Sequence, residues 1–227
     1  MLTNSTFWKL KHYIPMQQYS VETIKTWDRF YRANFINSLQ GFKPVSLIGT
    51  VNKGGQPNLA VFSNIVHLGA DPALIGFINR PMEAAPHTIQ NIEVTGEYTI
   101  NHIQSSFTAA AHQTSAKYSA DQSEFTETGL TPVFKENFKA PFVAQSNIQY
   151  ALQLVEIVPI HHNKTFLVIG TITGIYLEEG LVLPDGFIDL QKAGSIASLG
   201  IDGYYATTPV ARYEYAKPGK APVEIKG

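Results

Sequence analysis

The chain has 227 residues, with 17 Lys and Arg against 18 Asp and Glu, 44% hydrophobic residues and no cysteine. A chain of this length buries a large core unaided, and the missing cysteines exclude a disulfide scaffold, thiol catalysis and a thiolate metal site. The balanced charge argues against nucleic acid as a partner, and no apolar run approaches the roughly 20 residues of a membrane helix. We expect a cytoplasmic protein.

The N-terminal part predicts helix. The first 15 residues mix Lys9, Lys11 and His12 with apolar residues, which does not match a signal peptide. Apolar residues then recur at steps of three and four up to Gly41, which predicts one amphipathic helix or two short ones. We therefore expect an N-terminal helical segment at 1–44. The apolar stripe consists of Ile24, Trp27, Tyr31, Phe35 and Leu39.

Strand signals dominate the rest of the chain, and they are rich in β-branched and aromatic residues. A helix is predicted at 87–94, short helices and loops at 104–140, and a helical turn at 190–199. Strict alternation of strand and helix is absent, so the fold class is mainly β with helical insertions, built as an antiparallel barrel. The predicted strands are 45–52, 58–68, 73–78, 97–103, 148–160 and 165–177.

The common catalytic motifs are missing. The chain has no G-x-G-x-x-G, no P-loop and no G-x-S-x-G elbow, which argues against a Rossmann site, a phosphate-binding P-loop and a hydrolase. His161-His162 are expected at a solvated hairpin tip, and the other histidines are scattered, so we predict no metal site. An alternative interpretation keeps the barrel but replaces the ligand by haem or a pyridoxal phosphate-type molecule, bound through His67 or His87.

Three segments occur in order along the chain. The first runs from Gly49 to Pro81 and contains GTVN, NLA and GFINRP. The second, from His87 to Asn101, contains HTIQNI and TGEY. The third, from Ser123 to Ile172, contains SEF and GLTP. Together they resemble the flavin reductase-like family of FMN-binding split barrels, and the resemblance implies a domain at 45–227 with a C-terminal tail.

The resemblance implies FMN as cofactor. FMN phosphate needs cationic or N–H donors, which Arg80, Thr88 and the start of the predicted helix offer. The family often has Lys-Asp-Thr where this chain reads Pro86-His87-Thr88, so Arg80 is the expected phosphate contact. The predicted cofactor-binding residues are Asn58, Leu59, Ala60, Ser63, Asn64, Arg80, His87, Thr88, Ser115, Lys117 and Tyr118.

The resemblance also implies an activity. A flavin reductase passes hydride from NADH or NADPH to flavin, works as a homodimer and can supply a partner oxygenase. Because the flavin carries the chemistry, no catalytic side chain is assigned. A non-catalytic flavin-binding or electron-carrier protein with the same site is the alternative. Tyr204-Tyr205 are candidates to line a flat aromatic ligand, and the tail at 203–218 is a candidate to close the site.

Overall fold

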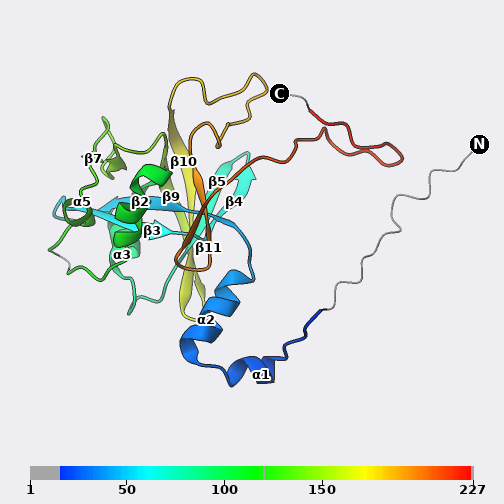
Figure 1. Cartoon of the computed structure of the whole chain (residues 1–227). Coiled ribbons are helices and arrows are strands. Elements are labelled where there is room, and N and C mark those ends of the chain that lie inside the picture. The colour runs from blue at the N-terminus through cyan, green and yellow to red at the C-terminus, as the bar shows by residue number, and fades with distance from the viewer. Residues whose placement is uncertain (1–15, 120, 226–227) are drawn as a thin grey trace, which may run out of the picture.

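The computed structural model describes residues 16–119 and 121–225, and its centre is a seven-stranded sheet (Figure 1). The strand order is β3-β2-β6-β9-β10-β5-β4, and every neighbouring pair is antiparallel. The fold class predicted from the sequence is therefore confirmed. The strands are β2 (Ser46–Val51), β3 (Pro57–Phe62), β4 (Ile65–Ala70), β5 (Ala73–Asn79), β6 (Glu97–His102), β9 (Ile148–Ile160) and β10 (Thr165–Leu177).

The sheet is curled into a split barrel. β3 and β4 are its two edge strands, although only Ser63 and Asn64 separate them in the chain. Three Cα steps reach about 11 Å at most, so the two edges must approach each other. The Asn64 side chain holds this link: its Nδ2 donates to the Ile78 carbonyl at 2.9 Å, and its Oδ1 accepts from the Ile78 N–H at 3.3 Å. The prediction of one strand at 58–68 is wrong, because this crossing divides it.

The sheet has an apolar cluster on each face. Adjacent residues of a strand point to opposite faces, so Leu47 and Ile48 of β2 enter different clusters and both are fully buried. One cluster packs under α3 (His87–Thr95), which contributes Ile89 and Ile92. The predicted helix is confirmed, and it ends at Gly96, whose φ of 73° suits a residue without Cβ.

Short helices cover the other cluster, as expected for 104–140. They are η1 (Ser105–Phe107), α4 (Thr108–Gln113) and α5 (Glu124–Thr128), and a small ladder of β7 (Pro132–Val133) with β8 (Phe142–Val143) follows. Phe107 and Phe125 come from these helices and pack into the cluster around Leu47.

A second sheet has the order β1-β11-β12, with β1 (Lys43–Pro44), β11 (Ile196–Leu199) and β12 (Gly203–Ala206). The predicted helical turn at 190–199 is wrong over its last four residues, which form β11. Burial there alternates with the period of a strand, since Ile196 and Ser198 are buried while Ala197 and Leu199 are half-buried.

The predicted N-terminal helix is two short ones, α1 (Val21–Lys25) and α2 (Arg29–Ser38). Asp28 separates them, because its carboxylate caps α2 by accepting from the N–H groups of Phe30 and Tyr31 at 2.8 and 3.2 Å. Neither helix has a buried residue. The part of the predicted helical segment before residue 16 lies outside the described residues.

Two predicted hairpins are confirmed. Gly54-Gly55 lie between β2 and β3, and the exposed His161-His162 lie between β9 and β10. Beyond β12 the tail runs away from the sheet as an extended arm, in which Tyr213 pairs with Glu224 (Figure 1). Across the described part of the chain, no helix has both the length and the apolar character to span a membrane.

Candidate functional site

A cavity of about 380 Å³ lies beside the link between β3 and β4. Its walls come from the end of β5, the start of α3, the loop after α4 and the small sheet. The fold therefore brings together segments that are far apart in the chain. All of the predicted site residues except Leu59 line this cavity: Asn58, Ala60, Ser63, Asn64, Arg80, His87, Thr88, Ser115, Lys117 and Tyr118.

Leu59 has a different place. Its side chain is fully buried in the cluster that contains Leu47 and Phe125. Its backbone N–H lies on the outer edge of β3 and donates to Glu124 Oε2 at 2.9 Å. Leu59 therefore affects the cavity through the position of β3 rather than by lining it.

The lining of the cavity includes cations and N–H donors. Arg80 and Lys117 are both exposed, and neither makes an ion pair within the described residues. The first turn of α3, at Pro86 to Thr88, lines the same cavity, and no side chain caps the helix start. Free N–H groups at a helix start attract anions, and a guanidinium binds phosphate in a bidentate manner. Asn79 Nδ2 donates to the carbonyls of Arg80 and Ala85 at 2.8 and 3.0 Å, so Arg80 and the start of α3 form one corner of the cavity. This corner suits a phosphate group.

The polar groups near the link are partly occupied by the fold. Both polar atoms of the Asn64 amide bond to the Ile78 backbone. Asn58 Nδ2 donates to Thr50 Oγ1 at 3.2 Å. Among the residues that the structure describes, Asn58 Oδ1 and Ser63 Oγ have no hydrogen-bond partner and are available for a ligand.

Glu124 lines the cavity and was not predicted as a site residue. It is only 6% exposed, and burial raises the pKa of its carboxyl. The hydrogen bond from the Leu59 N–H and the nearby His87 ring lower this pKa, but by less. Sequence reasoning misses it because an acidic residue at the start of a helix is usually solvated. Its contact with β3 is visible only in the folded chain.

His112 and Tyr204 also line the cavity. His112 Nδ1 and the Tyr204 hydroxyl lie 2.9 Å apart. Burial, and then the nearby Asp202, raise the pKa of the Tyr204 phenol. Tyr204 was one of two tyrosines expected near a ligand. Its neighbour Tyr205 instead packs against Phe42, with ring centroids 4.9 Å apart.

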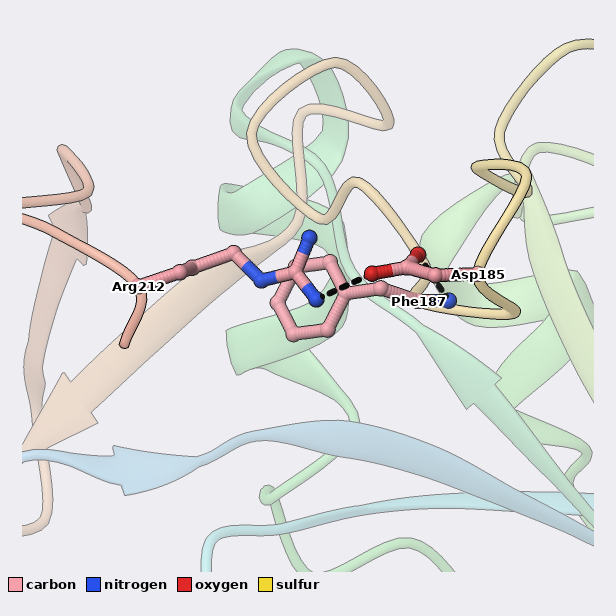
Figure 2. Close-up of polar contacts among 3 residues, drawn as sticks. All are labelled: Asp185, Phe187 and Arg212. Atoms are coloured by element: carbon pink, nitrogen blue, oxygen red, sulfur yellow. Dashed lines mark hydrogen bonds and ion pairs between the residues drawn. The ribbon is translucent and has the colours of Figure 1, made fainter. Parts of the chain in front are cut away.

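In the described part of the tail beyond Ala206, at 207–225, no residue lines the cavity of its own chain. Arg212 anchors its first part elsewhere, by donating to Asp185 Oδ2 at 2.6 Å and lying 3.8 Å from the centroid of the Phe187 ring (Figure 2). Of the segment predicted to close the site, only β12 reaches the cavity.

No group of three or more metal-ligating side chains occurs among residues 16–119 and 121–225. His67 is exposed on β4 and does not line the cavity, whereas His87 does. The site therefore presents anion-binding and hydrogen-bonding groups.

Comparison with known proteins identifies the family. Residues 42–189, more than half of the chain, match the model of the flavin reductase like domain. The chain belongs to this family, as the ordered segments of its sequence predicted. Membership implies a flavin ligand.

Solved structures agree with this assignment. A Shewanella frigidimarina NCIMB 400 protein described as a flavin reductase with a split barrel domain is 46% identical; the match covers 88% of this chain and 100% of that one, with a TM-score of 0.85. Nitrilotriacetate monooxygenase component B from Bacillus cereus is 22% identical, with coverage of 88% and 99% and a TM-score of 0.77. Flavoredoxin of Desulfovibrio vulgaris (Miyazaki F) is 24% identical, with coverage of 80% and 93% and a TM-score of 0.66. The last two share the fold.

Proposed function

We propose that the protein is an FMN-binding oxidoreductase of flavin reductase type, which passes hydride from NADH or NADPH to the flavin. The observation that carries this proposal is the corner where Arg80, without an ion pair in the described chain, lines the same cavity as the uncapped start of α3. That corner fits a phosphate, and the rest of the cavity has the mixed polar and apolar lining that a flavin ring needs.

The predicted residues divide into three roles. Arg80, Lys117 and the N–H groups of His87 and Thr88 would hold the phosphate. Asn58 Oδ1 and Ser63 Oγ are suited to the polar edge of the ring, with Ala60 beside them and Asn64 fixing the link. Ser115 and Tyr118 would shield the ring from water. The bound flavin supplies the hydride chemistry, so the side chains bind and orient.

Arg80→Ala tests the phosphate assignment. Loss of a charge-assisted hydrogen bond should weaken FMN binding by about 1.5–3 kcal/mol, which corresponds to roughly 10- to 100-fold in the dissociation constant. Flavin fluorescence during titration measures this constant. Arg29→Ala, on the remote helix α2, is the control and should bind FMN as the wild type does. An unchanged affinity for Arg80→Ala would remove this residue from the site.

The activity is tested on the FMN-loaded protein under anaerobic conditions. Rapid bleaching of the flavin band by NADH or NADPH supports the reductase. A retained band that neither nucleotide bleaches would favour the non-catalytic flavin carrier. A protein that neither retains FMN nor reduces free flavin would contradict the proposal as a whole.

We also propose a cytoplasmic homodimer in which the segment 1–44 precedes a flavin-binding domain at 45–227. The support for the dimer is an exposed apolar surface on α2 and its C-cap residue, where Phe30 is 74% and Leu39 66% exposed. Phe30→Glu should shift the protein toward a monomer in analytical ultracentrifugation. A wild type that sediments as a monomer with FMN bound would contradict the dimer alone.

A partner oxygenase is the proposed recipient of the reduced flavin. Its support is the fold shared with component B of a monooxygenase. A purified oxygenase component that turns over with reduced flavin from this protein would support it. Equal turnover with chemically reduced flavin in the absence of the protein would show that no specific partner is needed.

A further inference from the structure

A phenol and an imidazole form a pair on one wall of the cavity. Tyr204 comes from β12 and His112 from the end of α4, 92 positions apart in the chain. The hydroxyl and Nδ1 are 2.9 Å apart, and the two rings meet edge to face at 88° with centroids 5.7 Å apart. Both residues line the cavity together with the proposed flavin contacts.

The wall around this pair is polar and well supported. The register of the small sheet places Ser198 of β11 opposite Tyr204, and Ser198 also lines the cavity. Ser198 is 3% exposed, and its Oγ has no hydrogen-bond partner in the part of the chain that the structure describes. The Tyr204 ring packs against the cluster of Val45 and Leu47, which limits its movement.

The proposed hydride transfer from nicotinamide to flavin has no use for this pair, because that step moves a hydride and requires no side-chain acid. The phenol is protonated at neutral pH, because the ordinary pKa of tyrosine is about 10 and burial raises the pKa of Tyr204 further. When His112 donates its Nδ1–H to the phenol oxygen, the phenol O–H is free to donate to a second molecule in the cavity. The pair therefore suits a reaction that consumes both a hydride and a proton.

We propose that Tyr204, positioned by His112, donates a proton to an organic electron acceptor of the α,β-unsaturated carbonyl class. This inference rests on the proposed function, because the reduced flavin is the source of the hydride. The acceptor's C=C bond becomes a single bond: its β carbon gains the hydride, and its α carbon gains the proton as the Tyr204 O–H bond breaks. The flavin is oxidised by two electrons, and the phenolate recovers its proton from solvent through His112.

The main test separates the two half-reactions. FMN-loaded protein is first reduced with NADPH or dithionite without oxygen and then mixed with cinnamaldehyde, while the returning flavin absorbance is followed. Tyr204→Phe should slow this reoxidation by about 100-fold or more, the usual contribution of a positioned acid, whichever of the two reductants is used. Tyr205→Phe is the matched control and should react as the wild type does, since Tyr205 packs on Phe42 outside the cavity.

Two further readouts distinguish proton donation from a structural role. The wild type should reoxidise more slowly in D₂O than in H₂O, and His112→Asn should slow the reaction by about 10-fold. Equilibrium dialysis of cinnamaldehyde against the oxidised, FMN-loaded protein should show binding that Tyr204→Phe weakens about 3- to 10-fold, as expected for one lost hydrogen bond.

Reoxidation of Tyr204→Phe at the wild-type rate, in a variant that melts normally, would overturn the inference while the proposed function stands. Failure of cinnamaldehyde to reoxidise the reduced wild type would also overturn it. Failure both to retain FMN and to reduce free flavin is seen before any acceptor is added; it would refute the proposed function, and this inference would fall with it.

Discussion

The curled sheet and the two terminal segments use aromatic side chains in opposite ways. In the sheet, Phe77 and Tyr98 are fully buried and their rings meet edge to face. On α2 and the tail, Phe30 is 74% and Tyr215 91% exposed. In Figure 1 the helices α1 and α2 and the tail project away from the sheet.

Two aromatic side chains of α2 pack on Trp27, which lies between α1 and α2. Trp27 contacts the rings of Tyr31 and Phe35 edge to face, with centroids 5.1 and 5.0 Å apart. Such a small cluster contributes little compared with burial in the sheet. An apolar stripe on a helix therefore does not by itself show that the helix packs into the core of the protein. Here the stripe leaves an exposed apolar surface, which is typical of an interface.

The largest expected effect is on folding of the sheet. Phe77→Ala removes a fully buried ring and should lower the free energy of unfolding by about 3–5 kcal/mol. Phe30→Ala, its control on α2, should change the free energy of the monomer by less than about 0.5 kcal/mol. Urea denaturation at low protein concentration measures both. Similar losses for the two variants would contradict the distinction between the two regions.

The second largest expected effect is on the pH dependence of the free energy of unfolding. His102 of β6 lies in the sheet, with its Nδ1 3.0 Å from Ser195 Oγ, and burial lowers the pKa of its ring to about 4. Since this folded-state pKa lies below the usual 6.5, the unfolded chain binds a proton first as the pH falls. Stability should therefore fall between pH 6.5 and 4, by up to about 3 kcal/mol.

His102→Gln should make the free energy of unfolding less dependent on pH in this range, as measured by urea denaturation at pH 6.5 and 4.5. His162→Gln, at the exposed tip between β9 and β10, is the control for removal of a histidine. An identical pH dependence in His102→Gln and the wild type would show that this histidine is not the cause.

The smallest effect is expected in the tail. The Arg212 and Asp185 side chains are 31% and 48% exposed, so solvent screens their ion pair (Figure 2). Asp185→Asn should change the free energy of unfolding by less than about 1 kcal/mol. It should nevertheless release the tail and speed trypsin cleavage after Arg212 and Lys220, which is measured by mass spectrometry. Equal cleavage in Asp185→Asn and the control Glu179→Gln would show that the ion pair does not hold the tail.

The pattern of the sequence was sufficient for most strands and for α3. The hairpins around Gly54-Gly55 and His161-His162 follow from local signals, because turn residues and a period of two act within a few positions. The candidate site residues after β5 and at the start of α3 were predicted from the ordered family segments. Their joint place around one cavity is seen only in the structure.

Local sequence patterns could not predict the structural features that depend on contacts between distant parts of the chain. The break at Ser63-Asn64 exists because the sheet curls until its edges approach, and β11 forms because β1 and β12 are beside it. Glu124 meets β3 across 65 positions, and His112 meets Tyr204 across 92. The sequence by itself determined most strands of the seven-stranded sheet, the α3 helix and the family. Closure of the sheet decided the cavity, because periodicity carries no information about which distant segments pack together.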